Sequence, residues 1–593
     1  MTDSANLAVI NNNIEPHPAL AAIAKVLGTI AAQEWEIVRI WADALLWALA
    51  RGDSYIYIPR DHIAQLRSCR LLVGSAGMYS PFILTQQQLF LGRVWQLEQD
   101  VAGSICQLNR MASEQLGVSV AEDLQNWFAD DASQQQRFAA ALALVQHFVL
   151  INGGPGTGKT TTVAKILALI LKHVWQAPYP PQIALAAPTG KAATHMANAL
   201  QNALLKLNLS TDVFKPLSAL TGQTVHRLLQ LHPPLLISPY NSDNPLPIDI
   251  LVIDESSMLD LSLFKTLLQA LKAGVRLILL GDANQLPAVG AGSVLAELSQ
   301  PTILTPAIAN RLESLLPNIT KFAVQQDAGI AACVATLTHS YRFDPNKGIG
   351  ALAAACINGD EQAALSAMDG YVQLQWHQFG WSDLCRQWYQ LQHLWWQAVN
   401  GAEIHTIFNH LTDIMMLAAR KADAQAFNQH YRRYLAGKLG VDTENWFAGM
   451  PILVTQNDYD IGLYNGDIGV ILVDTDNNEQ LAAFFVDGQS YRKIALSRLP
   501  HHEPAFAITV HKSQGSEYDT VWLLAPQSPV THEDSGFNRA LLYTALTRAR
   551  HQFTFCGTSA QMVQAIKNNE QRRSGLRVAV NELMQQQTQM SLF

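Results

Sequence analysis

The residues best suited to chemistry in this sequence form one glycine-rich run. It reads Gly153, Gly154, Pro155, Gly156, Thr157, Gly158, Lys159 and Thr160, a complete G-x-x-x-x-G-K-T pattern, and Thr161 follows as a further candidate nucleotide contact. An apolar stretch precedes it and a helical stretch follows, which is the setting a phosphate-binding loop requires. Glycines let backbone N–H groups turn toward phosphates, and the helix N-terminus adds its positive dipole end. The pattern predicts that Lys159 reaches the β- and γ-phosphates of a nucleotide and that the Thr160 hydroxyl holds Mg²⁺.

Two adjacent carboxylates, Asp254 and Glu255, follow another short apolar run. At the end of a buried parallel strand they would lie beside the phosphate-binding loop. Asp254 could then bind Mg²⁺ through water, and Glu255 could polarise the attacking water. Alone, such a pair could merely cap the next helix. Together with the glycine-rich run it predicts nucleotide hydrolysis.

Two glutamines are candidates for reading the nucleotide. Gln285 follows the apolar run 277–280, and at a strand end it could sense the γ-phosphate and relay its presence to a neighbouring groove. The alternative is a tight turn, because Gly-Asp-Ala-Asn is turn chemistry by itself. Gln136 lies upstream of the loop and could read the adenine edge, although a solvated glutamine fits that position nearly as well.

Short apolar runs that alternate with helical stretches must position these groups. In the first half of the chain they cover residues 148–151, 183–187, 250–253 and 277–280. Such runs predict a parallel sheet in an α/β architecture. A second α/β region begins after about residue 340, and runs at 505–509, 521–524 and 553–556 complete its sheet.

The remaining segments predict two smaller units. The sequence from 449 to 504 has the pattern of β-strands, with turn signals at Asn465-Gly466 and Asp487-Gly488. It predicts a small barrel inserted in the second α/β domain. Residues 1–125 begin with a helical pattern that stops near Gly52 and carry no catalytic motif. The predicted domains are 1–125, 126–335, 336–448 together with 505–593, and the insertion 449–504.

Five of the thirteen tryptophans crowd into one helical stretch. They are Trp376, Trp381, Trp388, Trp395 and Trp396. Bases stack on aromatic side chains of this kind. Their roughly helical spacing is more often plain core, which is the interpretation we favour.

Composition narrows the protein class. A formal charge of −8 over 593 residues lacks the basic footprint of a protein that grips duplex DNA by bulk electrostatics, so any nucleic acid must bind in a local groove. The six cysteines form no C-x-x-C pair, which favours neither a disulfide framework nor a zinc or iron–sulfur site. There is no leader pattern, and no apolar run approaches the roughly 18 residues of a membrane span. We expect a cytoplasmic protein.

Several further motifs follow one another in a fixed order. After Gln136 and the glycine-rich run come A-P-T-G-K-A-A (187–193), T-V-H-R-L-L (224–229), D-E-S-S (254–257), G-D-A-N-Q-L-P (281–287), S-Y-R-F (340–343), T-V-H-K-S-Q-G-S-E (509–517) and Y-T-A-L-T-R-A-R (543–550). This order resembles superfamily 1 helicases, and more narrowly the RecD family, the α subunits of exodeoxyribonuclease V (RecBCD). The resemblance runs from about residue 80 to 580 and includes N-G-D-I-G (465–469) and R-R-S-G-L (572–576).

The resemblance implies two RecA-like P-loop NTPase domains, an SH3-like β domain at 449–504 and a mainly helical N-terminal domain that docks on partners. It implies an ATP-dependent 5′–3′ single-strand DNA translocase and helicase that uses ATP and Mg²⁺. Its partners would be RecB-like and RecC-like subunits, acting on double-strand DNA ends. Because the chain contains no Glu-x-Lys, the nuclease centre should lie on another subunit.

The resemblance also assigns residues around the nucleotide. Arg342 and Arg548 would reach the γ-phosphate from the second α/β domain, as an arginine finger does. Gly515 and Glu517 would contact the nucleotide. Because these groups and Lys159 would lie on opposite walls of a cleft, nucleotide binding could close the cleft and hydrolysis could open it.

The same resemblance gives a path for single-stranded DNA over both domains. The implied contacts are Pro188, Thr189, Lys191, His226, Arg227, Thr509, His511 and Ser513. Short polar side chains suit phosphate contacts without base discrimination, as a translocating motor demands.

Alternatives stay open at this point. One is a stand-alone RecD-like helicase, although those relatives usually carry a long N-terminal region. Another is an ATP-switched subunit that clamps DNA without unwinding it. The terminal residues 589–593 resemble the Q-x-x-L-F peptide that docks on the sliding clamp, and the bland alternative is a frayed polar tail.

Overall fold

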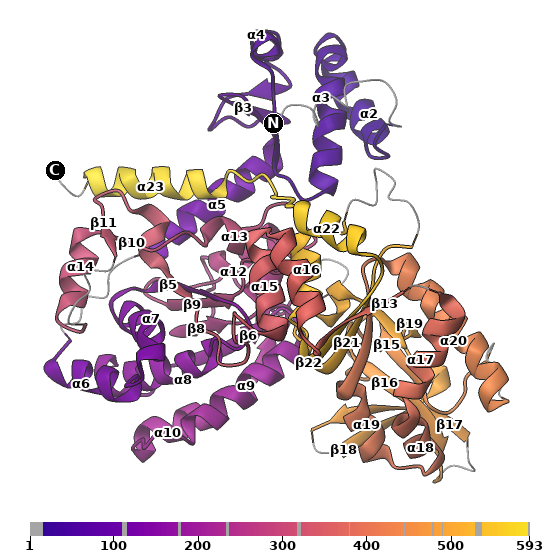
Figure 1. Cartoon of the computed structure of the whole chain (residues 1–593). Coiled ribbons are helices and arrows are strands. Elements are labelled where there is room, and N and C mark those ends of the chain that lie inside the picture. Colours follow the sequence, from indigo (N-terminus) through magenta and orange to yellow (C-terminus); the bar gives the residue numbers. More distant parts are fainter. Residues whose placement is uncertain are drawn as a thin grey trace.

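The computed structural model describes most of the chain. The described residues are 16–109, 116–175, 179–232, 236–316, 322–378, 380–440, 442, 445–458, 460–476, 480–488, 490–527 and 536–590. Two parallel sheets flanked by helices form the centre of the molecule (Figure 1). This confirms the predicted α/β class.

The first parallel sheet carries the glycine-rich run. Its order is β12 (Val334–Leu337), β5 (Phe148–Gly153), β9 (Arg276–Gly281), β8 (Ile250–Ile253), β6 (Ile183–Ala187) and β7 (Gly222–Thr224). All four apolar runs of the first half are strands in it. They are buried because helices cover both faces.

The helices of this first unit fall into two sets. One face is covered by α6 (Val118–Trp127), α7 (Gln134–Val145), α8 (Lys159–Leu169), α9 (Gly190–Leu204), α10 (Thr211–Ser218) and α14 (Pro306–Glu313). The other is covered by α5 (Gly92–Leu108), α11 (Val225–Leu228), α12 (Leu261–Gln269), α13 (Val294–Leu298) and α23 (Leu576–Met590). A short pair, β10 (Ile303–Leu304) and β11 (Ala323–Val324), lies outside the main sheet.

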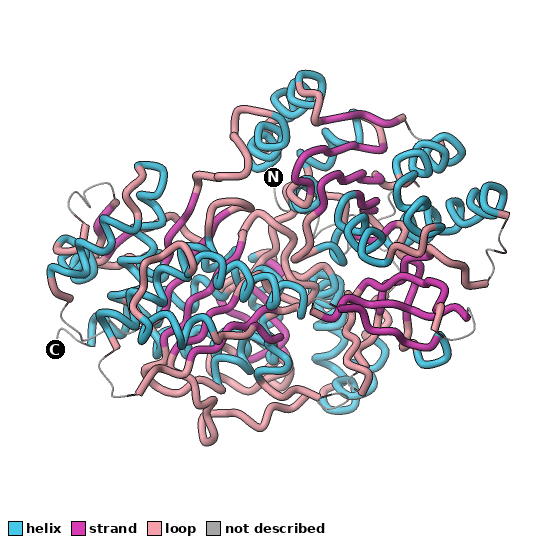
Figure 2. The backbone as a smooth tube through the Cα atoms, turned by 90° about the horizontal axis from the view of Figure 1, so that it is seen from below, coloured by secondary structure: helices cyan, strands magenta, loops and turns pink. Residues whose placement is uncertain are grey.

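The second parallel sheet forms as predicted from the apolar runs after residue 340. Its order is β13 (Leu374–His377), β22 (Ala549–Cys556), β21 (Tyr518–Leu524), β14 (Ile414–Ala418) and β20 (Ala507–Thr509). One face packs on α15 (Gly348–Asn358), α16 (Glu361–Gly370), α21 (Arg539–Leu546) and α22 (Ser559–Lys567). The other packs on α17 (Trp381–Leu391), α18 (His393–Asn400), α19 (Ile404–Asp413) and α20 (Lys421–Leu439). Figure 2 shows the strands running between these helices.

An antiparallel sheet is inserted in the second unit. Its order is β18 (Ser490–Ala495), β17 (Gln480–Asp487), β16 (Ile468–Asp474), β15 (Met450–Val454) and β19 (His502–Pro504). Gly488, with φ +62°, lies between β17 and β18, and Gly466, with φ +101°, precedes β16. Both turn signals therefore mark real turns.

The tryptophan cluster is core. Trp388, Trp395 and Trp396 are buried where the helices α17 and α18 meet the inserted sheet. The Trp395 indole donates a 3.2 Å hydrogen bond to the Gly449 carbonyl. Because these three rings are buried, a base cannot stack on them.

The N-terminal unit has its own apolar core. Helices α2 (Leu20–Ile30), α3 (Ala32–Ala50) and α4 (Arg60–Ser68) pack on a sheet of order β1 (Tyr55–Tyr57), β4 (Gln88–Leu91), β3 (Phe82–Thr85) and β2 (Val73–Gly74). The sequence predicted a mainly helical unit ending near 125. Helices α5 and α6 instead pack in the first unit, so the change of core falls near residue 91.

The C-terminal helix also packs on a different unit from the one predicted. We assigned residues 505–593 to the second unit, but α23 packs against α5 on the first one (Figure 1). Residues 585–590, expected to be a polar tail, continue this helix. The side chains of the clamp-like peptide at 589–593 lie outside the described residues. No helix in the described part of the chain is long and apolar enough to cross a membrane.

Candidate nucleotide site

The glycine-rich run forms a tight loop between β5 and α8. Gly156 and Gly158 have φ values of +75° and +79°, which glycine adopts without strain. A Cβ on Gly156 would lie 2.4 Å from the Cβ of Arg342. The backbone can approach a phosphate here because these positions carry no side chain.

Lys159 points into the mouth of this loop. Its ammonium donates to the carbonyls of Gly153 and Gly154, at 2.5 and 3.1 Å. The Thr157 hydroxyl donates to the Gly154 carbonyl at 2.9 Å. Anionic phosphate oxygens are stronger acceptors than these carbonyls, so the lysine is placed to change partners.

Gln136 lies behind the loop. Its amide donates a 2.8 Å hydrogen bond to the Thr157 carbonyl, and the side chain is buried. In this conformation Gln136 supports the loop backbone. Reading of the adenine edge stays a prediction.

The carboxylates lie where β8 ends. The Glu255 backbone donates a 2.8 Å hydrogen bond to Asp254 Oδ1 and adopts a left-handed conformation, with φ +51°. Burial raises the pKa of both carboxyls, and the nearby Lys159 opposes this for both. The strained backbone at Glu255 is typical of a functional position.

This donor set fits a magnesium ion. A cation would offset the burial that raises the pKa of Asp254. Thr160 is partly exposed in the first turn of α8, next to Lys159, whose charge acts on Asp254. No cluster of three or more acidic, histidine or cysteine ligands occurs among the described residues. Magnesium typically takes one or two carboxylates and completes its shell with waters and substrate phosphates, as these two residues would require.

A buried hydrogen-bond chain joins the two units across this site. Asp282 accepts hydrogen bonds from the Tyr543 hydroxyl, at 2.9 Å, and from the Gln285 amide, at 3.2 Å. The Gln285 oxygen accepts one from Arg548 Nη2, at 3.0 Å. Asp282 and Gln285 belong to the first unit and the others to the second. We call this the cross-unit chain, Asp282–Gln285–Arg548.

The next residue reinforces the chain. Leu286 is buried in the core of the second unit. Its N–H donates to the Thr544 hydroxyl at 2.9 Å, and its carbonyl accepts from Gln514 at 3.1 Å. Sequence reasoning gave no role to Asp282, Tyr543, Thr544 or Gln514, although all lie within the quoted motifs.

Arg548 has its donors directed inward. The buried guanidinium also bonds the carbonyls of Ser516, at 3.2 Å, and Thr544, at 3.3 Å. Its charge acts on Glu255 and opposes the rise in the pKa of that carboxyl. The residue therefore lies at the nucleotide cleft but is engaged with protein acceptors.

Arg342 is engaged as well. It forms a 2.7 Å ion pair with Glu517, which Arg550 also contacts at 3.4 Å. Burial alone would raise the pKa of Glu517. The hydrogen bond from Arg342 and the charges of the nearby arginines outweigh burial and hold the pKa of this carboxyl below its usual value. The Tyr341 N–H bonds the Gly156 carbonyl at 2.8 Å, which keeps this segment on the phosphate loop.

Some of the residues implied in DNA binding are exposed, and others make hydrogen bonds within the protein. Thr189 caps α9 by accepting from the Ala192 N–H at 3.3 Å. A Cβ on Gly515 would lie 3.5 Å from its hydroxyl, so the two units touch here. Pro188 is partly exposed beside Thr189.

Lys191 stands between the units with its ammonium 5.8 Å from the centre of the Tyr518 ring. The side chain remains exposed, but surrounding protein desolvates the charge and, with Arg548 and Arg550, lowers the pKa of Lys191 to about 8. An anion bound next to this ammonium would favour its charged form.

The other implied contacts lie in two short segments. Arg227 is exposed on α11, and burial lowers the pKa of its neighbour His226. Thr509 is partly exposed at the end of β20, and His511 is exposed beyond it. Ser513 is fully buried, with its hydroxyl donating to the Val510 carbonyl at 2.7 Å, so the structure does not bring it to the surface.

The fold and site define a P-loop nucleotide hydrolase in which hydrogen bonds join two parallel-sheet units next to the phosphate loop. The AAA domain family matches residues 136–291, and the UvrD-like helicase C-terminal domain family matches 504–556. The chain is 35% identical over 538 residues to the RecBCD enzyme subunit RecD of Mycobacterium tuberculosis (strain CDC 1551 / Oshkosh), covering 88% of this chain and 84% of that protein. The chain belongs to the RecD family of ATP-dependent helicases.

More distant proteins match less completely. Identity to the ATP-dependent RecD2 DNA helicase of Deinococcus radiodurans is 27% over 449 residues, covering 72% of this chain and 49% of that protein. The crystal structure of Bacteroides Pif1 bound to ssDNA matches at 18% identity with a TM-score of 0.36, covering 73% of this chain and 94% of that chain.

The cross-unit chain can be tested at Tyr543. Burial and Asp282 raise the pKa of this phenol, so its hydroxyl donates. Tyr543→Phe leaves the buried Asp282 short of a donor and should lower the free energy of unfolding by about 1–3 kcal/mol in urea titrations. The control is Tyr371→Phe, whose hydroxyl bonds an exposed carbonyl at Asn346, where water can replace it. Equal effects of the two substitutions would contradict the role of the chain.

Proposed function

We propose that this chain is an ATP-driven 5′–3′ single-strand DNA translocase and helicase, working as a subunit of a RecBCD-type complex on double-strand DNA ends. The observation that carries the proposal is the cross-unit chain, which ties Gln285 beside the nucleotide to Arg548 of the other unit. A motor requires that the state of the nucleotide change how the two units hold one another. The match covers 84% of the Mycobacterium tuberculosis RecD subunit but only 49% of RecD2, which favours the subunit over a stand-alone helicase.

The residues around the phosphates support a simple reaction scheme. Lys159 would turn from the loop carbonyls to the β- and γ-phosphates, and Thr160 and Asp254 would hold Mg²⁺, which would supply charge neutralisation for the phosphates. Glu255 orients the attacking water and takes its proton, for which a raised pKa is an advantage at neutral pH. Gly515 and Glu517 line the nucleotide cleft.

The stroke would be an exchange of partners by two arginines. To reach the γ-phosphate, Arg342 must leave Glu517 and Arg548 must leave Gln285. The Arg548–Gln285 bond joins the two units, and the Arg342–Glu517 pair lies next to the Tyr341 segment that bonds the phosphate loop. Nucleotide binding would therefore alter the contact between the units, and hydrolysis would restore it.

The finer assignments belong to the same proposal. We take the units to be RecA-like domains and the antiparallel sheet at 450–504 to be an SH3-like domain that covers the strand. The nuclease centre would lie on a RecB-like or RecC-like partner. A cytoplasmic location and a sliding-clamp contact through residues 589–593 remain predictions.

The central test is Lys159→Gln. Removing the point charge from the phosphates should lower DNA-stimulated ATP turnover by at least about 100-fold, because phosphoryl transfer depends on positioning and charge. Turnover and unwinding of a 5′-tailed duplex would be measured together. The control is Lys165→Gln, whose ammonium bonds the Trp127 carbonyl away from the loop. Near-normal turnover in Lys159→Gln would refute the motor, and turnover without unwinding would indicate an ATP-switched clamp.

The DNA path gives a second test with a pH signature. If Lys191 and Arg227 touch phosphates, neutralising either should reduce the salt slope of single-strand binding by roughly one unit at pH 7. Lys191 carries its charge below its pKa of about 8 and loses it above. Wild-type affinity should therefore fall between pH 7 and 9, and Lys191→Arg should abolish that fall while Arg227→Gln leaves it. An unchanged slope would remove the residue from the path.

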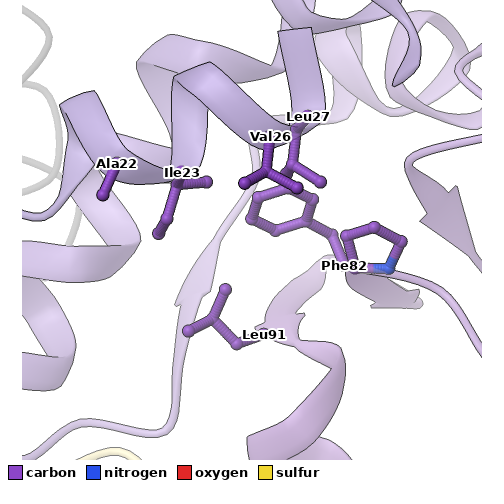
Figure 3. A pocket seen from close by; sticks show the side chains of 7 residues that line it. Ala22, Ile23, Val26, Leu27, Phe82 and Leu91 are labelled. Atoms are coloured by element: carbon purple, nitrogen blue, oxygen red, sulfur yellow. The ribbon is translucent and has the colours of Figure 1, made fainter. Parts of the chain in front are cut away.

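The N-terminal unit offers a surface for the partner subunits. An open apolar groove of about 390 Å³ is lined by Ala22, Ile23, Val26, Leu27, Pro81, Phe82 and Leu91 (Figure 3). Val26 is 58% exposed at its edge. The groove lies outside the two units that hold the nucleotide site, which suits docking on a RecB-like or RecC-like chain rather than catalysis.

Docking is tested by Val26→Glu in the full chain. A charge at the rim of an apolar groove should weaken co-assembly with the partner subunits by at least about tenfold, measured by co-purification and titration. DNA-independent ATP turnover should not change. Ile40→Glu, at a 48% exposed position on α3 that does not line the groove, is the control. Equal assembly by the two variants would exclude the groove as the docking site.

A further inference from the structure

Arg572 holds a loop that is distant from it in sequence. Its Nη1 donates to the carbonyl of Ala288, to that of Gly290 at 3.0 Å and to that of Gly292 at 3.3 Å. Burial lowers the pKa of this arginine, while Glu570 and Asp53 favour its charged form. One partly buried cation therefore organises the turn 288–292.

This loop continues directly from the cross-unit chain. Leu286 is anchored in the second unit, and only Pro287 separates it from Ala288. Proline fixes φ, so this single residue absorbs little movement. A displacement of Gln285 and Leu286 is thus passed to the carbonyls that Arg572 holds.

The segment that carries Arg572 is anchored on the N-terminal unit through Asp53 and Ser54 and on α5 of the first unit through Glu98. Asp53 accepts from the Arg573 N–H at 2.8 Å, and the Ser54 N–H donates to the Arg573 carbonyl at 2.7 Å. The buried Glu98 accepts from the Ser574 hydroxyl at 2.7 Å. A Cβ on Gly52 would lie 2.4 Å from Arg572 Nε, so the guanidinium fits closely against this unit.

The segment leading into this loop is joined to a residue implied in DNA binding, because Gln514, which donates to the Leu286 carbonyl at 3.1 Å, also donates its backbone N–H to the His511 carbonyl at 3.4 Å. The charge of Arg572 acts on His511 and contributes to the lowered pKa of that histidine, after burial. A Cβ on Gly290 would lie 2.9 Å from the Cβ of Asp260, whose charge acts on His226. Val289, in the same loop, is 83% exposed.

We propose that Arg572 is a positioning residue that fixes the loop 288–292 as the relay between the DNA path and the cross-unit chain, and that ties this relay to the N-terminal unit. The inference rests on the proposed DNA-driven function. Without Arg572 the loop carbonyls lose their common donor, so occupation of the DNA path no longer sets the position of Gln285. Nucleotide binding itself does not pass through Arg572.

The experiment compares Arg572→Gln and Arg572→Lys in the full chain, with Arg573→Gln as the matched control. Arg573 is the adjacent arginine, and its guanidinium lies over the Tyr57 ring. We measure ATP turnover without DNA and with increasing oligo-dT, the KM for ATP, and thermal unfolding. Arg572→Gln should lose about tenfold of the stimulation by DNA, a typical coupling between sites, while basal turnover, the KM for ATP and unfolding stay near wild type.

Arg572→Lys should recover most of the stimulation, because an ammonium offers three donors to the same carbonyls. Arg573→Gln should resemble wild type. The inference is overturned if Arg572→Gln is stimulated normally, if basal and stimulated turnover fall together, or if Arg572→Lys is no better than Arg572→Gln. A wild-type chain that oligo-dT does not stimulate would refute the proposed function itself, which separates the two failures.

Discussion

The buried chain Asp282–Gln285–Arg548 is the contact on which the arrangement of the two units depends. Its members have almost no access to water, so each hydrogen bond that breaks must be replaced or leave a buried polar group unpaired. Separating the units without a substitute would leave Arg548 Nη2 and the Gln285 oxygen without each other, and a buried polar group left unpaired typically costs about 1–3 kcal/mol. On the proposed mechanism, the two units would change their contact by exchange of acceptors. A nucleotide phosphate is the acceptor best able to compete for this arginine.

The same principle accounts for the rest of the site. Lys159 rests on loop carbonyls, Arg342 on Glu517, and Arg548 on Gln285, so each cation that would bind a phosphate already has an internal acceptor. The two carboxyl groups differ from these cations, because burial raises the pKa of Asp254 and Glu255 and so disfavours their charged forms. The left-handed backbone of Glu255 adds strain on the order of 1–3 kcal/mol. The site is thus built to gain most when phosphates and a divalent cation arrive together.

Local sequence signals predicted most of the strands and the phosphate loop. The unit to which a helix belongs depends on long-range packing, which these signals do not contain. The glycine-rich run, the strands ending at Asp254 and near Gln285, and the inserted antiparallel sheet follow from composition, periodicity and turn residues, which act over a few positions. The assignment of α5 to the N-terminal unit and of α23 to the second unit was wrong because these helices pack on each other across nearly the whole chain. An amphipathic pattern indicates that a helix is buried but not against which partner. Ser513 shows the same limit on a small scale, since its hydroxyl direction is set by the turn at Val510.

The packing of α23 has a consequence for motion. Because the chain returns to the first unit at α23, the second unit is an insertion tethered at both ends rather than a domain at the end of the chain. One tether passes over the phosphate loop, where Tyr341 bonds Gly156. The other passes through Arg572, which holds the loop after Gln285. A rigid body held at two points can rotate about the line that joins them, but it cannot drift away, so cleft closure should be a hinge rotation with both hinges beside the nucleotide site. In the proposed mechanism, small shifts at the phosphates would be converted into rotation of the second unit over the proposed DNA path.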